Sequence, residues 1–382
     1  MLIDLTRLAS RLLEGKRPTG VDRVSLAYLE HFGPGAEALV RHWGRWVPLG
    51  VASGGAFAAL LGQAPRPAAR VRTAVATSYA LRWSMRRGAV LLNTGHSGLD
   101  DPAYAEQVRR YGLRPVYFLH DLIPITHPEY CRPGEADKHA RRLRTMLSTG
   151  VGLILNSEAT AADLRAWASA QGMALPPTVV APIGTVLLPG ACATPPLAEP
   201  YFVMLGTVEP RKNHLLLLHL WRQMADGGGG AIPKLVVIGQ RGWECEQVID
   251  LLERCQALRG HVVELRDCDD TALSTWLAHA RALLFPSFVE GYGMPLAEAL
   301  GHGLPVIASN LAVFREIAGA IPDYLDPLDG PGWWRAVLDY AAAGSAARAA
   351  QLERMRGGRA PTWDDHFCMV ENFLASIPGG AA

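Results

Sequence analysis

Short apolar runs alternate with longer amphipathic segments along most of the chain. Leu2–Leu5, Ala89–Asn93 and Val116–Leu119 are mainly apolar and have the length of strands, as is typical of strands buried in a parallel sheet. From Val21 to Phe32, the apolar positions recur at the spacing of one helical face. This alternation predicts an α/β protein built from strand–helix units.

A stretch without periodicity divides these units into two series. Residues 189–200 read PGACATPPLAEP, which is rich in Pro and Ala, as linkers between domains often are. We therefore expect one domain over residues 1–190 and a second over residues 200–361. The tail, residues 362–382, contains a further helix pattern with one apolar face.

The stretch from Phe285 to Leu311 has the pattern of a strand end, a glycine-rich turn, a helix and a second strand. Gly291 and Gly293 mark a place where the backbone bends tightly or lets a ligand come close. Pro295 suits the first turn of a helix, where its missing N–H costs nothing. This geometry aims free N–H groups and the positive helix end at one place, so it predicts an anion site.

Two carboxylates flank the predicted anion site. Glu290 lies in the turn, and Glu298 follows Pro295 by about one helical turn. Each one alone is also explained as an acidic residue near a helix start, solvated and favoured by the helix dipole. The presence of both around one site favours a role in binding a ligand.

A second loop carries two adjacent cations. It reads GTVEPRKN from Gly206 to Asn213 and follows the apolar run Tyr201–Leu205. The fixed guanidinium fork of Arg211 and the ammonium group of Lys212 together suit a ligand with adjacent phosphates. An isolated pair of this kind would otherwise be read as two surface cations.

These two segments resemble the signatures of a known family. The sequence EGYGMPLAE, from Glu290 to Glu298, is similar to the E-x7-E signature of retaining glycosyltransferases, especially glycosyltransferase family 4, and GTVEPRKN resembles the same family's second signature. The resemblance implies an α/β fold of the GT-B type, with two Rossmann-like doubly wound domains facing across a cleft. It also implies that the donor binds the C-terminal domain and the acceptor the N-terminal one, with the helix in residues 362–382 packed back on the first domain.

The resemblance also assigns roles to residues. It implies that Arg211 and Lys212 stabilise the leaving diphosphate, that Glu290 orients the transferred sugar and supports its developing positive charge, and that Glu298 binds the ribose hydroxyls. The implied catalytic residues are Glu290, Lys212, Arg211 and His120. The implied donor-binding residues are Gly206, Arg211, Lys212, Gly291, Tyr292, Gly293, Met294, Pro295, Leu296 and Glu298.

Histidines follow two of the predicted strands in the first domain. Ligands collect at the carboxyl ends of parallel strands, where His96 and His120 are expected. His96 has only its position in favour of a site role, and a lone histidine at a strand end is more often a structural residue. His120 resembles the family's histidine near the donor sugar, and Asp121 is expected to orient it or to contact the acceptor. Gly20, in the sequence TGVDRV, is a third acceptor-side candidate or part of a simple turn.

Charge is distributed unevenly, although the net charge is +1. Up to Pro195 the chain has 22 Lys and Arg against 14 Asp and Glu, and beyond it 15 against 22. This asymmetry suggests that the first half faces something anionic, such as a membrane surface or a lipid diphosphate. A charge-paired interface between the domains is the alternative. No feature points to a nucleic-acid partner.

The sequence also bears on compartment and metals. The N-terminal stretch has charges where a signal peptide needs an unbroken apolar core, so we expect a cytoplasmic protein, with the inner face of the membrane as a possible location. The six cysteines form no C-x-x-C pair, which indicates neither a zinc site nor a disulfide framework. Asp267 and Asp269 match a D-x-D metal triplet, but they precede a helix pattern where a cap is expected. We therefore expect metal-independent chemistry without a resident cofactor.

Taken together, the sequence predicts a retaining hexosyltransferase of polysaccharide biosynthesis that uses a nucleoside diphosphate sugar and a glycan or polyprenyl-linked acceptor. GDP-mannose is the preferred donor, because HDLIPITHPEY and GTVEPRKN resemble segments of mannosyl- and rhamnosyltransferases of bacterial surface-polysaccharide assembly. A glycogen- or sucrose-type synthase and a non-hydrolysing sugar-nucleotide epimerase are alternatives with the same architecture. A catalytically silent partner that binds nucleotide sugar is the alternative from another class.

Overall fold

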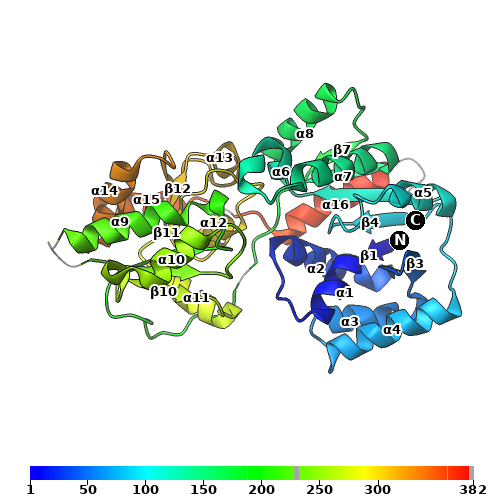
Figure 1. Ribbon diagram of the computed structural model, residues 1–382, viewed down its shortest axis with the longest axis horizontal. Coiled ribbons are helices and arrows are strands. Elements are labelled where there is room, and N and C mark those ends of the chain that lie inside the picture. The colour runs from blue at the N-terminus through cyan, green and yellow to red at the C-terminus, as the bar shows by residue number, and fades with distance from the viewer. Residues whose placement is uncertain (187, 228–231, 359, 378–382) are drawn as a thin grey trace. The chain divides into compact units, whose positions relative to one another are not determined.

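The computed structural model describes residues 1–186, 188–227, 232–358 and 360–377, and its contacts divide the chain into two compact units (Figure 1). The first unit comprises Met1–Thr126, Gly134–Ile183 and the C-terminal segment that begins at Trp363. The second comprises His127–Pro133 and Gly184–Thr362. Residues 378–382, the end of the expected C-terminal helical segment, lie outside the described part of the chain.

The first unit is organised around a seven-stranded sheet with the strand order β3-β2-β1-β4-β5-β6-β7. All neighbouring strands are parallel except β3, which pairs antiparallel with β2 at one edge. The central strands are buried on both faces, which explains their apolar runs. The strands are β1 (Leu2–Asp4), β2 (Glu37–His42), β3 (Arg45–Pro48), β4 (Val90–Asn93), β5 (Arg114–Leu119), β6 (Gly152–Leu155) and β7 (Thr178–Val180).

Helices cover both faces of this sheet. Figure 1 shows α1 (Thr6–Leu13), α3 (Ser53–Leu60) and α4 (Pro67–Leu81) on one side of the strands and α5 (Pro102–Tyr111) and α7 (Glu135–Thr149) on the other. Each layer has its own apolar core: Leu8, Phe57 and Val71 belong to one, and Tyr104 and Leu143 to the other. The remaining helices of this unit are α2 (Gly20–Phe32), α6 (Ile123–Thr126), α8 (Glu158–Ala170) and α16 (Trp363–Ser376).

The sequence pattern predicted no element between residues 33 and 88, where the structure has β2, β3, α3 and α4. The short hairpin between β2 and β3 turns at Trp43 and Gly44, whose φ angles are +47° and +71°. Trp43 is not a typical residue for a left-handed turn position. Helix α3 reads SGGAFAAL and has no polar face, so its sequence shows no amphipathic period.

A buried polar pair joins α16 to the core of the first unit. Nδ1 of His366 lies 3.1 Å from the carbonyl oxygen of Ala181 and 3.0 Å from that of Pro182, and Nε2 lies 2.9 Å from the hydroxyl of Tyr28. Carbonyl oxygens only accept, so Nδ1 carries the proton and Nε2 accepts from Tyr28. Burial lowers the pKa of His366 to about 4, which keeps this neutral form at pH 7.

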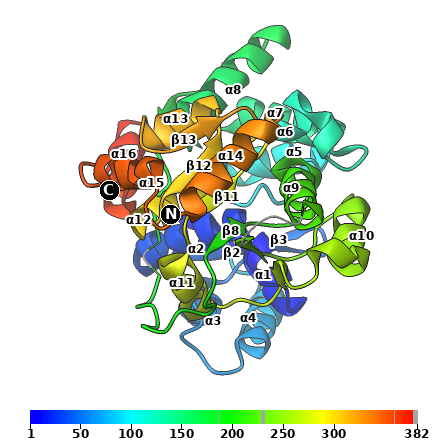
Figure 2. The same ribbon diagram turned by 90° about the vertical axis from the view of Figure 1, so that its left-hand side faces the viewer.

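The second unit contains a six-stranded, fully parallel sheet with the order β10-β9-β8-β11-β12-β13. Figure 2, in which this unit faces the viewer, shows its strands between α9 and α10 on one side and α11 and α12 on the other. The strands are β8 (Tyr201–Leu205), β9 (Lys234–Ile238), β10 (Val262–Leu265), β11 (Leu283–Phe285), β12 (Val306–Ser309) and β13 (Asp323–Leu325). The helices are α9 (His214–Asp226), α10 (Glu246–Arg254), α11 (Asp270–His279), α12 (Met294–Gly301), α13 (Ala312–Ala318), α14 (Gly330–Ala341) and α15 (Ala346–Met355).

One short segment belongs to the second unit although the sequence assigned it to the first domain. The ring of Tyr130 stacks on Phe288 with centroids 5.4 Å apart and planes 2° from parallel. The indole N–H of Trp243 donates to the carbonyl oxygen of Tyr130 over 3.4 Å. These contacts group His127–Pro133 with the second unit. Such long-range ring contacts leave no periodic signal in sequence, so the pattern along the chain does not separate this segment from residues 1–190.

Every helix in the described ranges is too short or too polar to cross a membrane.

The pair between Tyr28 and His366 gives a test of the first unit's packing. Tyr28→Phe keeps the ring and removes the hydroxyl, which leaves Nε2 of His366 buried without its partner. We expect the free energy of unfolding to fall by about 1–3 kcal/mol, the usual cost of an unsatisfied buried polar group. Chemical denaturation at pH 7 measures this change. Tyr79→Phe is the control, because Tyr79 is only partly buried, and an equal loss in both variants would contradict the prediction.

Candidate functional site

Both sheets have a point at which the order of successive strands reverses direction. In the second unit the reversal lies between β8 and β11, and in the first unit it lies between β1 and β4. Ligands of open α/β sheets bind outside the carboxyl ends of the strands at such a switch point. The loops that follow these four strands are therefore the places to look for a site.

The loops after β8 and β11 are bonded to each other. The N–H of Phe288 donates to the carbonyl oxygen of Arg211 over 2.8 Å, and the side-chain amide of Asn213 donates to the carbonyl oxygen of Pro286 over 3.2 Å. Gly206 and Asn213 adopt positive φ angles of +141° and +58°, which turn the first loop sharply at its two ends. The local backbone thus brings the two sequence signatures side by side.

Four charged side chains meet where these loops touch. Nη1 of Arg211 lies 2.5 Å from Oε2 of Glu290, and the ammonium group of Lys212 pairs with Oε1 of the same carboxylate. Nη2 of Arg211 lies 2.6 Å from Oε1 of Glu209. The hydroxyl of Ser287 donates to Oε1 of Glu290 over 2.8 Å. Glu209 and Lys212 are 3% and 6% exposed, so this cluster is shielded from water.

The cluster balances two cations against two carboxylates. Burial alone would raise the pKa of Glu290, but the charges of Arg211 and Lys212 outweigh it and hold this pKa at about 2. Burial and the neighbouring Arg211 lower the pKa of Lys212 against the opposing pull of Glu290, and burial raises the pKa of Glu209. Such a site holds cations ready for an anionic group, because buried charges interact more strongly than exposed ones.

The remaining donor-side candidates lie in the same loops and in α12. The φ of Gly293 is +113°, and a Cβ atom there would lie 2.7 Å from the ring of Phe314, so this position requires glycine. The helix begins at Met294, one residue before the expected start at Pro295. Glu298 is 3% exposed, which rules out the alternative of a solvated helix residue. Tyr292 and Leu296 are also buried, whereas Gly291 is half-buried.

The loop after β9 approaches the loop after β8. A Cβ atom on Gly239 would lie 2.0 Å from the carbonyl oxygen of Gly206, so the two backbones meet here at a distance that only glycine allows. Arg241, in the β9 loop, is held by Glu264 at 2.8 Å and by Glu253 at 2.5 Å. This loop therefore supports the candidate site through its backbone, while its arginine is already paired.

In the first unit, His96 and His120 follow the carboxyl ends of β4 and β5, and His139 of α7 approaches them. Nε2 of His120 donates to the carbonyl oxygen of Thr94 over 2.7 Å, and Nε2 of His96 donates to that of Phe118 over 2.7 Å. The rings of His96 and His120 are 5.1 Å apart, and His139 follows at 5.9 Å from His96.

Burial keeps these imidazoles neutral. It lowers the pKa of His120 to about 4 and also lowers those of His96 and His139. The carboxylate of Asp121 accepts from the N–H of Ile123 over 3.1 Å at the start of α6, and its carbonyl oxygen accepts from His139 over 3.0 Å. Asp121 thus holds the loop after β5 in place.

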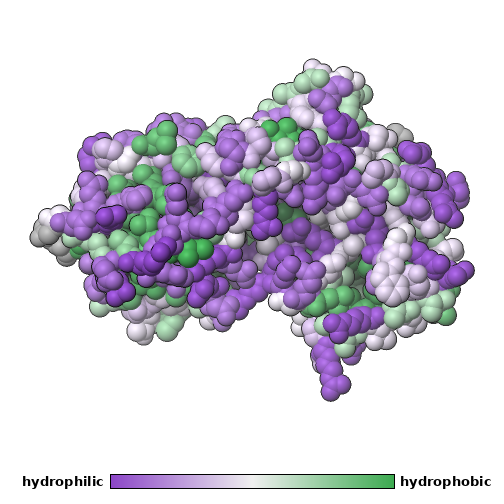
Figure 3. Space-filling model, in the orientation of Figure 1, coloured by the Kyte–Doolittle hydropathy of each residue, from purple (hydrophilic) through white to green (hydrophobic). Residues whose placement is uncertain are grey.

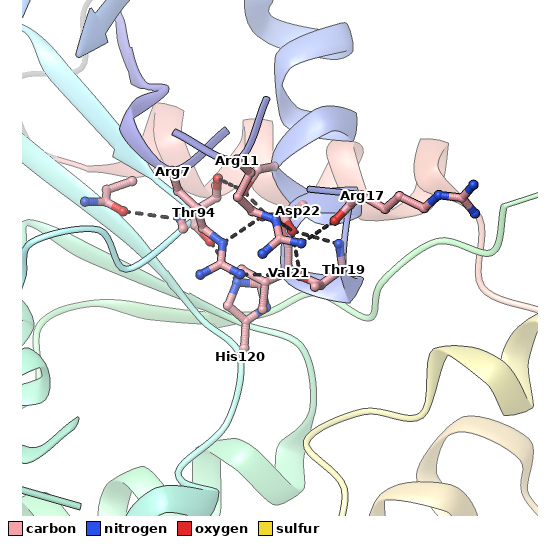
Figure 4. A network of polar contacts seen from close by, with 11 residues as sticks. Arg7, Arg11, Arg17, Thr19, Val21, Asp22, Thr94 and His120 are labelled. Carbon is pink, nitrogen blue, oxygen red and sulfur yellow. Dashed lines mark hydrogen bonds and ion pairs between the residues drawn. The ribbon is translucent and has the colours of Figure 1, made fainter. Parts of the chain in front are cut away.

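A network of arginines surrounds a buried carboxylate beside His120 (Figure 4). The Nε atoms of Arg7 and Arg11 lie 2.7 Å from the two oxygens of Asp22, which is 1% exposed. The N–H of Thr19 donates to the same carboxylate over 2.7 Å, so Asp22 also holds the start of α2. Gly20, the first residue of α2, is exposed and lies at this helix start.

Arg7, Arg11 and Asp22 are functional candidates that the sequence pattern did not single out. Two signals were available: the arginines are four residues apart, which places them on one face of a helix, and Thr19 and Asp22 have the spacing of a capping box. The first half of the chain has an excess of positive charge, but sequence alone does not show which of its cations meet at one carboxylate.

The described residues contain no group of three or more His, Cys, Asp or Glu side chains that could hold a metal ion. Asp269 accepts a hydrogen bond from the N–H of Ala272 over 2.8 Å at the start of α11. Its predicted role as a helix cap is confirmed.

Comparison with solved structures gives the fold. HepE from Anabaena in complex with UDP-glucose superposes with a TM-score of 0.68 at 15% identity and covers 98% of this chain and 99% of that one. Sucrose-phosphate synthase from Thermosynechococcus elongatus gives a TM-score of 0.65 at 16% identity, with 97% of each chain covered. Both neighbours are GT-B glycosyltransferases.

Sequence comparison gives the relatives. The serotype-specific mannosyltransferase WbdA of Escherichia coli is 28% identical over 233 residues, which cover 56% of this chain and 28% of that protein. The O-antigen chain mannosyltransferase B of Escherichia coli is 36% identical over 129 residues, or 34% of this chain and 33% of that protein. The chain thus spans about a third or less of the length of these relatives.

The family model described as glycosyl transferases group 1 matches residues 199–331. This range contains the loops after β8 and β11 together with α12, and so all the charged residues of the second unit's cluster. Residues 199–331 are therefore similar to the glycosyl transferases group 1 family, and the chain as a whole has the GT-B fold.

Proposed function

We propose that this chain is a retaining hexosyltransferase of polysaccharide biosynthesis. It transfers a hexose from a nucleoside diphosphate sugar to a glycan or polyprenyl-linked acceptor. The observation that carries the proposal is the buried cluster of Arg211, Lys212 and Glu290 at the switch point of the second unit, in the segment that is similar to the glycosyl transferases group 1 family. The mannosyltransferase relatives support a mannosyl donor, for which GDP-mannose is the first choice.

In the proposed reaction, the bond between the anomeric carbon and the diphosphate oxygen breaks as the acceptor oxygen bonds to the same carbon on the same face. The proton of the acceptor hydroxyl passes to an oxygen of the departing phosphate. Negative charge grows on the diphosphate, where Arg211 and Lys212 stabilise it from a shielded position. No redox partner or resident metal takes part in this proposal.

Glu290 has two tasks in this proposal. Because its pKa is about 2, it is ionised throughout the neutral range and keeps both cations in place. When the diphosphate takes over part of that pairing, the carboxylate orients the sugar and supports its developing positive charge. Gly206, residues 291–296 and Glu298 complete the proposed donor site through the loop backbones and the start of α12.

The first unit is proposed to bind the acceptor. His96 and His120 follow β4 and β5 at the switch point of their sheet, and Asp121 follows His120 in the same loop. Gly20, at the start of α2, is the other proposed acceptor-side residue. The neutral imidazoles supply hydrogen-bonding groups without positive charge. Contact of this basic unit with an anionic membrane remains part of the proposal, as does a cytoplasmic location.

The charge cluster gives the first test of the proposed chemistry. Lys212→Met keeps most of the side-chain volume but removes a cation from the leaving group, so we expect kcat to fall by roughly 10²–10³-fold, as for loss of one transition-state donor. Glu290→Gln should reduce kcat as well, since Lys212 loses its paired carboxylate and Arg211 keeps only Glu209. Lys234→Met is the matched control at a lysine that pairs with Glu199. Unchanged turnover by folded Lys212→Met protein would contradict the assignment.

The buried histidine gives a test by pH. The pKa of His120 lies near 4 rather than 6.5, so this group stays neutral as the pH falls from 7 to 5. If kcat/KM falls as the pH is lowered, we expect that titration of His120 near pH 6.5 is not the cause. In the unfolded chain, His120 binds a proton near pH 6.5, whereas in the folded chain it does so only near pH 4. The free energy of unfolding should therefore fall as the pH drops from 6.5 toward 4. An acid limb near 6.5 that disappears in His120→Gln would contradict the lowered pKa.

A third test identifies the donor by how much it raises the stability of the folded chain. A ligand that binds only the folded chain raises the free energy of unfolding by about 2.7 kcal/mol at 100 times its dissociation constant. We expect GDP-mannose to raise the melting temperature more than UDP-glucose, UDP-N-acetylglucosamine or GDP alone, and Lys212→Met to abolish the rise. NMR of the transferred product should show the anomeric configuration of the donor. An inverted product would contradict the retaining mechanism.

A further inference from the structure

A cavity in the first unit lies away from the switch point. It has a volume of about 470 Å³, within the range of small-ligand sites. It opens beside β3, between the C-terminal ends of α4 and α5, and its walls include Arg45, Trp46, Tyr79, Arg82, Trp83 and Arg110. Two strands, β2 and β1, separate β3 from β4 and its histidine loop in the order of the sheet.

Aromatic rings form much of the wall. The Arg45 guanidinium lies over the ring of Tyr79, 4.8 Å from its centroid, and the ring of Trp46 is 6.2 Å from that of Tyr111. Trp83 packs over Gly50, where an added Cβ atom would lie 3.0 Å from the indole. Trp83 is nevertheless 40% exposed. The exposed part of the Trp83 indole is therefore available to a ring-shaped ligand.

The three arginines of the cavity lack carboxylate partners. Within the described part of the chain, no ion pair joins Arg45, Arg82 or Arg110 to an acidic side chain, and no Asp or Glu lines the cavity. By contrast, Arg7 and Arg11 share the buried Asp22. The cavity thus gathers three guanidinium groups whose charge the protein leaves uncompensated, which favours an anionic ligand.

The backbone at one of these arginines is unusual. Arg82 follows the last residue of α4 with a φ of +53° and a ψ of +49°, the left-handed conformation that most side chains avoid. Conformations of this kind cost free energy and gather at ligand sites. At this helix end a glycine would be the ordinary choice, so Arg82 occupies a position that side chains usually avoid.

We propose that this cavity binds an acidic saccharide, that is, a sugar residue carrying a carboxylate or a phosphate. The guanidinium fork matches the two oxygens of either anion, and the exposed indole of Trp83 matches the apolar face of a pyranose ring. The cavity opens at the outer edge of a sheet, so a glycan chain can continue on both sides of the bound residue. This site is independent of the proposed transfer reaction.

The surface argues for a saccharide over a membrane. On the side in view, Figure 3 shows strongly hydrophilic and pale side chains over β3, while the apolar ones gather lower down, over α3 and α4. Insertion into a bilayer uses a continuous apolar face. The arginines line a hollow. A single sugar residue can enter this hollow and contact several of them, whereas a flat lipid surface would contact fewer.

Calorimetric titration of the full chain tests the proposal. Tetragalacturonate is the probe that carries carboxylates, and glucose 6-phosphate is the probe that carries a phosphate. Maltotetraose is the neutral sugar for comparison, and phosphatidylglycerol vesicles test binding to a lipid surface. We expect at least one acidic saccharide to bind, and Arg110→Glu or Arg82→Glu to weaken it at least tenfold. Arg109→Glu is the matched control, since Arg109 is exposed on the same helix and does not line the cavity. Lys212→Met should bind this probe normally, which separates the site from the donor site.

Several outcomes would overturn the proposal. These are no binding by either acidic saccharide, equal weakening by Arg109→Glu and Arg110→Glu, or equal affinity for maltotetraose. Binding of vesicles that depends on Arg110, without binding of an acidic saccharide, would assign the cavity to a lipid surface instead. Melting temperatures of all variants establish that each is folded.

Discussion

The second unit depends on keeping two cations side by side in a place that water hardly reaches. Arg211 and Lys212 repel each other, and burial penalises both charges, so neither position is stable without Glu290 and Glu209. The backbone bonds between the loops after β8 and β11 fix where these partners meet. An anionic ligand can take over part of the pairing. The arrangement that stabilises the folded unit therefore also suits a diphosphate.

The two units use one topology for different chemistry. Each has its switch point beside its first strand, but the second unit places balanced full charges there, whereas the first places neutral histidines next to a carboxylate clamped by arginines. The difference follows from the loops, since the strands in both sheets are buried apolar runs. In the proposed reaction, charge stabilisation thus belongs to the donor side and neutral hydrogen bonding to the acceptor side.

Much of the fold could be predicted because buried parallel strands leave continuous apolar runs, as at Val116–Leu119. Arg211, Lys212 and Glu290 were singled out because each lies in a loop directly after such a run, and the structure places them in contact. Other features depend on contacts between residues far apart in sequence. The clamp on Asp22 and the stacking of Tyr130 on Phe288 are of this kind. The β2–β3 hairpin was missed because Trp43 is an atypical turn residue.

The central claim is that the paired cations receive the diphosphate of the donor. A crystal structure of the chain with a bound nucleoside diphosphate tests this most directly. The account predicts phosphate oxygens within about 3 Å of the side-chain nitrogens of Arg211 and Lys212, as in charge-assisted hydrogen bonds, with the contacts of Glu290 to these cations loosened or shared. A diphosphate bound elsewhere, with both cations still held only by their carboxylates, would contradict it.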